Sequence, residues 1–430
     1  MNESNKMHMP PRGMRDFYPD DMRIRNAIFN AWRQASLAFG FDEYDACVVE
    51  SLDLLIRKAG EEIVEQIYSF KDKSGRDLAL RPEMTPTLAR MIAARQGSLG
   101  FPLKWFTIAQ CFRYERMTRG RKREHYQWNL DIVGEESVTA ETEIIATAVN
   151  ALKLLGLDKN SLTVRFSSRE LLAELLAGLG IERRHYPTVF LTLDKRRKIN
   201  DTETEQLLIN AGIDAGTIKK IFSLLQIESL DQAEKMLATQ HTSEHAMETI
   251  RKFMTLLDTY GISDMVAFDI SVVRGLAYYT GIVFEAFDTC GEFRAVFGGG
   301  RYDNLLSDIG GKPATGVGLG FGDVVIAEIL SARNKSFGNV SSGRMEVGYM
   351  EETQRITAMK IAASFRKKSY NVGLSLKPEK AKAFFSRAGK SGAQQAVFIG
   401  PDDIASGSIR LKNLISRLEE RIPLSHLCDD

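Results

Sequence analysis

Residues 104–134 read KWFTIAQCFRYERMTRGRKREHYQWNLDIVG, and this stretch decides the fold. Residues 104–115 are rich in aromatic and β-branched side chains, as is typical of a strand, and residues 126–134 share that texture. The polar residues 116–125 between them are typical of a long loop. The stretch therefore predicts a hairpin of two strands with a strongly basic tip.

The tip of this hairpin carries an unusual charge. Six basic residues and one acid, Glu115, lie between Arg113 and Arg123. A solvated basic loop is the ordinary explanation of such a run. Arg113 and Glu115 are expected on the strand itself, however, where alternation puts both on one face. Because an unpaired arginine on a buried sheet face is costly, the pattern indicates either an anionic ligand or a fixed ion pair.

Helical periodicity occurs on both sides of the hairpin. Apolar residues recur at helical spacing before Gly40, and residues 85–94 and 139–155 show the same period. Glu83 lies at the end of the strand-like residues 78–82, immediately before the second of these helices. Thr85 is either a helix N-cap or, with Glu83, part of a binding site.

Residues 169–260 differ from their surroundings. They are Leu-, Glu- and Lys-rich, lack glycine motifs and have helical periodicity, which predicts an all-helical insertion. Strand-like sequence returns over residues 266–287. Two glycine clusters follow, FGGGRYDN at 297–304 and GVGLGFGD at 316–323, and the first predicts a glycine turn that leads into a helix.

Arg274 lies within an apolar stretch, SVVRGLAYYTGIVF, closely followed by Tyr278 and Tyr279. A turn arginine with two core tyrosines explains this arrangement. Gly275 and Gly281 favour the alternative that a tight backbone brings the arginine to a cavity.

The carboxy-terminal part has its own organisation. Residues 333–344 are polar and Gly/Ser-rich, as in a linker. Strand-like and helical segments alternate beyond it, which predicts a small α/β domain with a parallel sheet. Beyond Met345, Lys and Arg number 14 against 10 acids, so this domain is basic.

Composition sets outer limits on function. The whole chain of 430 residues has 57 basic and 56 acidic side chains, which excludes a nonspecific polyanion-binding coat and an acidic disordered chain. The four cysteines form no metal or disulfide pattern, and no run approaches the length of a membrane span. A cytoplasmic protein without membrane association is expected.

Together these motifs resemble the class II histidyl-tRNA synthetases over nearly the whole chain. LALRPEMTP, CFRYERMTRGRKREHYQ, SVVRGLAYYTG and FGGGRYDNL are similar to four of that family's elements, and the last two are the most specific. The resemblance implies an α+β catalytic domain with an antiparallel sheet at 1–168 and 261–332. It also implies an all-helical insertion at 169–260, a linker at 333–344 and an α/β anticodon-binding domain at 345–430.

The resemblance also implies the reaction: ATP-dependent activation of L-histidine and its transfer to tRNA(His), by a homodimer that uses Mg²⁺ with ATP as substrate. Arg113 and Arg274 would be catalytic, at opposite sides of the α-phosphate, because fixed guanidinium groups can neutralise the anions that react there. No metal-binding side chain is implied. The binding residues would be Arg113, Glu115 and Arg121 for ATP, and Glu83, Thr85, Arg113, Gln127, Asp131, Arg274, Tyr278 and Tyr279 for histidine.

The chain departs from the family pattern at three places. Gly322 and Asp323 stand where the third motif of the class has glutamate and arginine, and an aspartate near a triphosphate is repulsive unless Mg²⁺ or another arginine intervenes. Cys47 takes the place of a proline in the dimer strand and is expected to pack as a small apolar residue. Ala277 replaces an aspartate beside the expected histidine pocket.

Two other functions remain open at this point. The first departure is typical of the family's non-catalytic relative, the histidine-sensing regulatory subunit of ATP phosphoribosyltransferase. The presence of Arg113, Arg274 and a carboxy-terminal domain favours the enzyme. A general RNA-binding module that uses the basic hairpin would leave Glu83 and the glycine clusters without a role.

Overall fold

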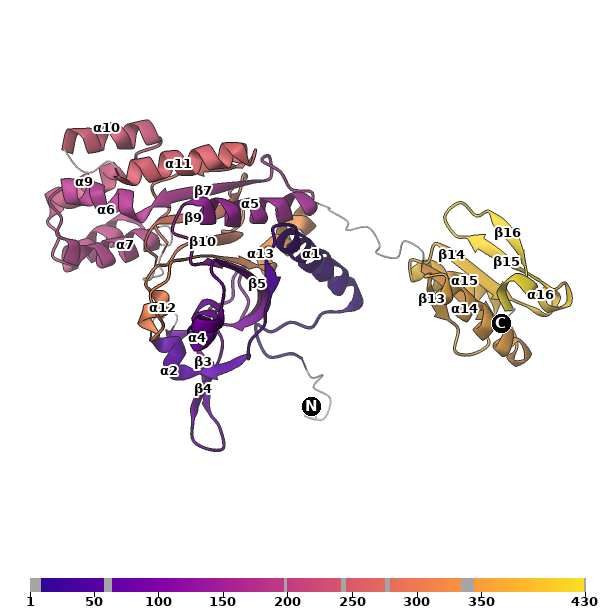
Figure 1. Ribbon diagram of the computed structural model, residues 1–430. Helices are drawn as coiled ribbons and strands as arrows, with labels where there is room; N and C mark the ends of the chain where they lie inside the picture. The colour runs from indigo at the N-terminus through magenta and orange to yellow at the C-terminus, as the bar shows by residue number, and fades with distance from the viewer. Residues whose placement is uncertain are drawn as a thin grey trace, which may run out of the picture. The chain divides into compact units, whose positions relative to one another are not determined.

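An eight-stranded sheet forms the centre of the first of two compact units into which the chain divides after residue 335 (Figure 1). The computed structural model describes residues 9–57, 64–196, 199–240, 245–274, 279–333 and 344–428. The strand order is β1-β5-β6-β11-β10-β9-β7-β8; the six inner strands are antiparallel, and β1 and β8 pair in parallel at the edges. The strands are β1 (Asp42–Glu43), β5 (Leu103–Phe112), β6 (Glu124–Val133), β7 (Leu162–Ser168), β8 (Val266–Phe268), β9 (Ile282–Asp288), β10 (Phe297–Arg301) and β11 (Gly316–Gly322).

This sheet confirms the α+β class with an antiparallel sheet and the predicted hairpin. β5 and β6 pair over ten residues, from Leu103 opposite Val133 to Phe112 opposite Glu124. The strand-like reading of residues 266–287 is correct only at its ends, since β8 stops at Phe268 and β9 starts at Ile282.

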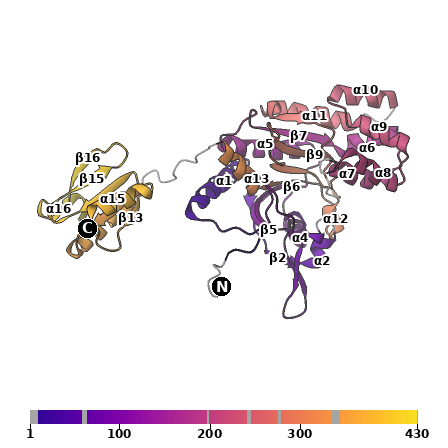
Figure 2. The same cartoon turned by 180° about the vertical axis from the view of Figure 1, so that it is seen from behind.

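Helices cover one face of the sheet. They are α1 (Pro19–Ala38), α5 (Thr139–Leu154) and α13 (Asp323–Ala332), which lie together in Figures 1 and 2. The indole rings of Trp32 in α1 and Trp128 in β6 stack with centroids 5.8 Å apart, and the Trp128 indole N–H donates to Ser36 Oγ at 3.0 Å. Because side chains alternate along a strand, Trp128 on this face places Gln127, Asn129 and Asp131 on the other face.

Glycines form part of that other face. Gly298 and Gly300 of β10 lie directly opposite Gly320 and Gly318 of β11. We call these four residues the glycine floor. The prediction that the first glycine cluster is a turn is wrong, because its glycines lie within β10, where bulky side chains have no room. A Cβ atom on Gly299 would lie 2.1 Å from the carbonyl oxygen of Gly318.

Helices occupy the described residues between β7 and β8. Ser168 caps the first of them by accepting a hydrogen bond from the Leu171 N–H, and leucines such as Leu172 and Leu175 form its buried face. The helices are α6 (Arg169–Gly178), η3 (Arg183–His185), α7 (Tyr186–Lys195), α8 (Asp201–Asn210), α9 (Ala215–Leu224), α10 (Leu230–Gln240), α11 (His245–Thr259) and η4 (Ser263–Met265).

A small three-stranded sheet of order β2-β4-β3 lies before β5 in the sequence. The helix that follows it starts at Thr85 itself, with Met84 at the N-cap position and no side-chain cap, so the N-cap explanation of Thr85 is wrong. These elements, with the short helix after β10, are β2 (Val49–Ser51), α2 (Leu52–Ile56), β3 (Tyr68–Lys71), β4 (Asp77–Leu80), α4 (Thr85–Arg95), η2 (Gln96–Ser98) and α12 (Leu305–Asp308).

The second unit has a five-stranded sheet of order β13-β12-β14-β15-β16. The first three strands are parallel as predicted, but β15 and β16 are antiparallel, so a wholly parallel sheet was wrong. The β15–β16 hairpin has few buried residues, so its sequence lacks the apolar pattern that would predict these two strands. The elements are β12 (Arg344–Tyr349), η5 (Glu352–Gln354), α14 (Arg355–Lys367), β13 (Asn371–Leu374), α15 (Ala381–Lys390), β14 (Gln395–Ile399), α16 (Pro401–Ala405), β15 (Ser408–Asn413), β16 (Glu419–Pro423) and α17 (Ser425–Cys428).

Among the described helices of both units, none combines the length and the apolar character needed to cross a membrane.

Candidate active site

The loop of the β5–β6 hairpin begins earlier than the sequence indicates. β5 ends at Phe112, so Arg113 and Glu115 lie beyond the strand and do not share a strand face. The Arg113 N–H still donates to the carbonyl of Arg123 at 2.9 Å, and its Nε donates to the carbonyl of Pro82 at 2.9 Å. These two bonds fix Arg113 next to the segment that carries Glu83.

Glu115 and Arg121 pair with each other inside this loop. Arg121 Nη1 lies 2.7 Å from Glu115 Oε2, and the carboxylate is largely shielded from solvent while the guanidinium is about one-third exposed. This ion pair involves Arg121. Arg113, for which the sequence left an anionic ligand or a fixed ion pair open, forms no ion pair among the described residues. A guanidinium group carries five N–H donors, so this pairing uses only part of the donor capacity of Arg121.

Glu83 is a buried carboxylate next to two cations. Burial raises the pKa of Glu83 above its ordinary value, while the charges of Arg113 and Arg274 oppose that shift. Thr85, the first residue of α4, is also buried two residues later. A buried carboxylate of this kind is suited to receive a substrate ammonium group.

Asp131 has one carboxylate oxygen without a partner. Its Oδ1 accepts a hydrogen bond from the Tyr302 hydroxyl at 2.6 Å, whereas its buried Oδ2 accepts none from the described residues. Burial raises the pKa of Asp131 to about 7, which the bond from Tyr302 partly opposes. An orphaned buried oxygen on a titratable group is a typical mark of a ligand contact.

Arg274 is held in a strained conformation. Its φ is +59°, a region that residues other than glycine rarely adopt. Its Nη1 lies 2.5 Å from Glu285 Oε1, and its buried Nε has no hydrogen-bond partner among the described residues. Burial disfavours the charged guanidinium, but Glu285 and then Tyr279 outweigh it and raise the pKa of Arg274.

The glycine floor brings these side chains together. A Cβ atom at Gly298 would lie 2.4 Å from Nη1 of Arg274, and one at Gly318 would lie 2.4 Å from Oδ1 of Asp131. The floor residues Gly300 and Gly320 lie in the same way below Tyr279 and Gln127. Side chains from distant segments of the chain therefore meet over these four glycines, which have no side chains themselves.

Most of the predicted site residues are thus placed around one surface. The charges of Arg113 and Arg274 lower the pKa of Glu83, and the charge of Glu83 raises the pKa of Tyr279. Gln127 and Asp131 face the floor from β6. Glu115 and Arg121 lie in the adjoining loop. No described contact joins Thr85 to this group, and Tyr278 lies outside the described residues.

Two residues of this surface are missing from the sequence-based assignment: Tyr302, which bonds Asp131, and Glu285, which pairs with Arg274. Tyr302 belongs to the GGGRYD motif, which offers a signal. Glu285 lies in the apolar strand β9, where alternation alone gives no indication of its partner.

The aspartate at the altered third motif is also accounted for. Asp323 is buried at the start of α13; its Oδ2 lies 3.0 Å from Nη2 of Arg15, and its Oδ1 accepts from the Tyr126 N–H at 2.9 Å. Burial raises the pKa of Asp323, and Arg15 opposes this shift. The repulsion expected of this aspartate is therefore countered by an arginine from the amino-terminal segment.

The arrangement suits a small zwitterion beside a phosphate. Glu83 can receive an ammonium group, Arg113 and Arg274 can receive anionic oxygens, and Asp131 Oδ2 can accept a ring N–H. The described residues include no cluster of three or more His, Cys, Asp or Glu that could hold a metal ion.

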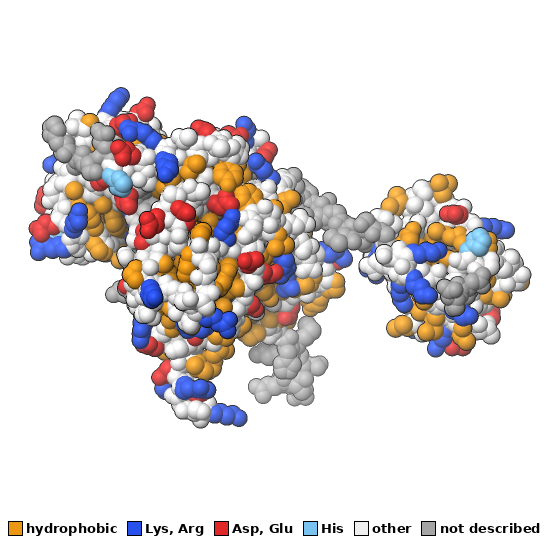
Figure 3. Space-filling model, viewed as in Figure 1, with side chains coloured by type: hydrophobic (Ala, Val, Ile, Leu, Met, Phe, Trp, Pro, Cys, Tyr) orange, Lys and Arg blue, Asp and Glu red, His pale blue; other side chains and the backbone are white. Residues whose placement is uncertain are grey.

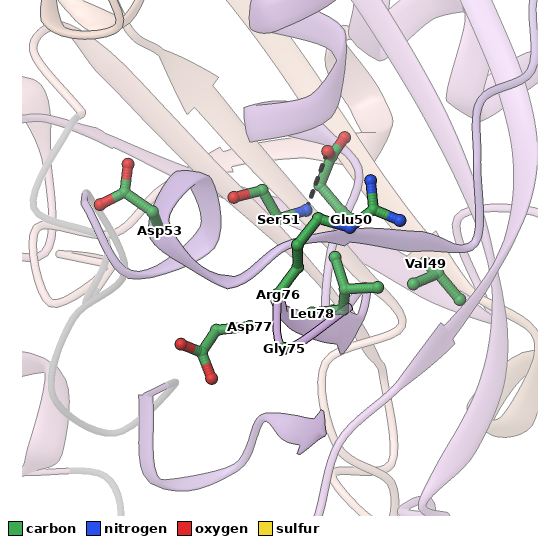
Figure 4. A pocket seen from close by; sticks show the side chains of 8 residues that line it. All are labelled: Val49, Glu50, Ser51, Asp53, Gly75, Arg76, Asp77 and Leu78. Carbon is green, nitrogen blue, oxygen red and sulfur yellow. Dashed lines mark hydrogen bonds between the residues drawn. The ribbon is translucent and has the colours of Figure 1, made fainter. Parts of the chain in front are cut away.

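A hollow of about 670 Å³ lies elsewhere, on the small sheet (Figure 4). Its lining comes from β2, the start of α2 and the β3–β4 turn, and includes none of the predicted site residues: Val49, Glu50, Ser51, Asp53, Gly75, Arg76, Asp77 and Leu78. Inside it the Ser51 N–H donates to Glu50 at 3.0 Å, the dashed line in Figure 4.

The chain is similar to known proteins over nearly its whole length. Residues 13–323 match the family described as "Histidyl-tRNA synthetase", and residues 343–429 match "Anticodon binding domain". A curated relative from Arabidopsis thaliana, "Histidine--tRNA ligase, chloroplastic/mitochondrial", is 41% identical over 97% of this chain and 85% of its own. "Histidine--tRNA ligase" of Opitutus terrae is 39% identical over 96% and 95%. The crystal structure of histidyl-tRNA synthetase from Nostoc sp. PCC 7120 has a TM-score of 0.81, with 21% identity and 98% coverage of both chains, and supports the fold.

Proposed function

The chain belongs to the histidyl-tRNA synthetase family, and from this premise we propose that it is a histidine--tRNA ligase that activates L-histidine with ATP and transfers it to tRNA(His). The observation that carries the proposal is the orphaned Oδ2 of Asp131, which lies on the same sheet face as Gln127 and the glycine floor. A buried acceptor there selects a ligand that supplies a ring N–H.

Adenylate formation brings two anions together, the histidine carboxylate and the α-phosphate of ATP. Arg113 and Arg274 neutralise their repulsion as negative charge develops on the oxygens around the reacting phosphorus. Both guanidinium groups are fixed before the substrates bind, Arg113 by Pro82 and Arg274 by Glu285. Catalysis therefore costs little reorganisation at this step.

Histidine is recognised at both ends. Glu83, with Thr85 and Gln127, receives the α-ammonium group, and Asp131 with Tyr278 and Tyr279 reads the imidazole nitrogens. Tyr302 fixes the Asp131 carboxylate by donating to its Oδ1, so only Oδ2 remains for the ring. An analogue without the ring N–H leaves Oδ2 unpaired, which costs binding energy.

ATP is bound at the hairpin loop by Arg113, Glu115 and Arg121. Mg²⁺ brought by the nucleotide would offset phosphate charge there and would keep most of its waters. The chain's own arginines orient the phosphate that reacts.

Transfer to tRNA uses both units. The second unit contains the match to the anticodon-binding domain at residues 343–429, and we assign residues 345–430 to that domain; its basic excess suits phosphate contacts. Figure 3 displays Lys and Arg side chains on the visible face of that unit. We assign residues 1–168 and 261–332 to catalysis, 169–260 to the helical insertion and 333–344 to the linker, in a cytoplasmic protein.

The protein acts as a homodimer through its small sheet. Val49 and Phe70 of this sheet and Ile56 of the adjoining helix α2 are each 39–45% exposed, and such apolar side chains suit a contact with a partner subunit. Cys47, just before β2, is also exposed, so its expected packing as an apolar residue would require the partner subunit.

Histidine-dependent exchange of pyrophosphate into ATP tests the proposal. Exchange by the purified protein is the expected result, followed by charging of tRNA(His). A protein that binds histidine but gives no exchange would instead be a regulator of the ATP phosphoribosyltransferase type. Sedimentation equilibrium tests the dimer, and a monomer at micromolar concentration would contradict it.

A further inference from the structure

Arg169 joins the helical insertion to the segment that carries Arg274. It is the first residue of α6, directly after β7, and its side chain is buried, with 7% of the residue exposed. Its guanidinium donates to three backbone carbonyls: Nε to Val273 at 3.3 Å, Nη1 to Tyr279 at 3.0 Å and Nη2 to Arg274 at 2.5 Å.

These three carbonyls lie on both sides of residues 275–278, which are outside the described part of the chain. One guanidinium therefore ties together the two backbone segments that present Arg274 and Tyr279 to the glycine floor. Arg274 needs such a restraint, because its φ of +59° is costly for a residue with a Cβ and persists only where the surroundings enforce it.

The anchor itself is well fixed. The backbone N–H of Arg169 donates to the carbonyl of Gly281 at 3.0 Å, and its guanidinium carbon lies 5.1 Å from the ring centroid of Phe190 in α7. Burial lowers the pKa of Arg169 to about 10, and Arg274 adds repulsion, yet the group remains charged at neutral pH. A planar fork with several donors suits this task, whereas a lysine has one nitrogen and cannot reach three carbonyls in these directions.

We propose that Arg169 is a positioning residue for adenylation, which holds Arg274 and Tyr279 in their reactive placement and makes that placement depend on the helical insertion. This inference rests on the proposed function. Arg169 donates to the backbone carbonyls of Val273, Arg274 and Tyr279, so it acts through the placement of Arg274 and Tyr279 and has no direct part in the chemistry.

The first test does not need activity. Hydrogen–deuterium exchange of the full-length protein should show faster deuterium uptake in peptides that cover Val273, Arg274 and Tyr279 when Arg169→Met is introduced. The matched control is Arg165→Met, four residues earlier on β7, where the half-exposed arginine pairs with Asp269 at 3.1 Å. Uptake equal to that of the unmodified protein in those peptides would overturn the inference, whether or not the protein catalyses exchange.

The second test measures the coupling to Arg274. Arg169→Met and Arg169→Lys should both lower kcat of pyrophosphate exchange about 100-fold, the scale of a misplaced catalytic group, with KM for ATP within about threefold. In an Arg274→Lys background the loss caused by Arg169→Met should shrink below about threefold. An equal loss in both backgrounds, or full activity in Arg169→Lys, would contradict positioning through Arg274. A chain that shows no exchange at all refutes the proposed function instead, and the deuterium uptake still decides the role of Arg169.

Discussion

Buried charged side chains in two regions of this protein differ in how many of their polar atoms have a partner. On the glycine-floor side of the large sheet, Asp131 has one bonded oxygen and one orphan, and the buried Nε of Arg274 has no partner among the described residues. In the second unit, Glu346 is just as buried, yet its Oε1 lies 3.2 Å from Arg344 and its Oε2 lies 2.8 Å from Arg387.

Fully bonded buried charges are not confined to the second unit. Arg301 of β10 is buried in the first unit, and it makes two bonds of 2.7 Å to Glu141 and further bonds to the carbonyls of Glu135 and Ser137. Charges that hold the fold together are saturated, because breaking a buried pair is strongly destabilising. Asp131 and Arg274 beside the floor each keep one buried atom without a hydrogen-bond partner among the described residues, as we expect where a ligand completes a site.

Among the substitutions that test this difference, the largest effect on pyrophosphate exchange is expected at Arg113. Arg113→Ala should lower pyrophosphate exchange by about 1000-fold, since the lost guanidinium would stabilise charge that develops only during the reaction. The melting temperature should stay nearly constant, because Arg113 contributes one side-chain bond to a carbonyl.

Arg119→Ala is the control for this change. Arg119 is in the same loop, with its side chain 63% exposed and 3.9 Å from Glu328, so its removal should leave exchange within a few-fold. Equal losses in both variants would show that the loop acts by its general charge.

The next effect concerns Asp131. Asp131→Asn should weaken histidine binding, measured by calorimetry, about 10- to 100-fold, because the amide places an NH2 donor where the carboxylate Oδ2 would accept the ring N–H. The amide can still accept from Tyr302, so the pocket should keep its shape. Unchanged affinity would place the ring contact on another residue.

The same variant should alter the pH dependence of stability. Burial raises the pKa of Asp131 from 3.8 to about 7, so the folded protein holds this proton more tightly than the unfolded chain does between those values. The free energy of unfolding should therefore fall as pH rises through that window, by at most roughly 4 kcal/mol, and stay low above pH 7.

Asp131→Asn should remove this contribution. Thermal unfolding of the ligand-free protein at pH 5 and pH 8 measures it: the unmodified protein should lose more stability than the variant. A larger loss in the variant would mean that the carboxylate is stabilised in its charged form.

The smallest effect on pyrophosphate exchange is expected when Glu346, both of whose carboxylate oxygens are paired, is replaced. Glu346→Ala leaves Arg344 and Arg387 without their buried partner, and should destabilise the second unit by about 1–3 kcal/mol. Pyrophosphate exchange should be unchanged while tRNA charging falls. Urea unfolding followed by both assays tests this, and a parallel loss of exchange would contradict the separation of roles.

The sequence predicted the fold best where signals are local. The β5–β6 hairpin, the helix that ends near Gly40 and the carboxy-terminal α/β pattern need only strand or helix periodicity, and the structure contains them. The motif residues Glu83, Arg113, Arg274 and Tyr279 interact electrostatically in the structure, and the roles assigned to them remain predictions.

The errors arose where conformation depends on distant contacts. Gly298 and Gly300 were assigned to a turn because glycine is common in turns. They lie in a strand, where a side chain at either position would collide with its neighbours. Arg113 and Glu115 were placed on one strand face, yet β5 ends before both, where the chain turns to pair Glu115 with Arg121.

The sequence by itself determined the class of fold, the basic hairpin and the set of chemically capable residues, because these follow from local periodicity and from motifs written in contiguous letters. Only the tertiary structure decided which charges are saturated and which are left for a ligand. It pairs Asp323 with Arg15, Asp131 with Tyr302, and the carbonyls around Arg274 with Arg169. The partners in each pair are more than a hundred residues apart in the chain. The packing of the whole sheet selects such partners, and local sequence patterns do not predict them.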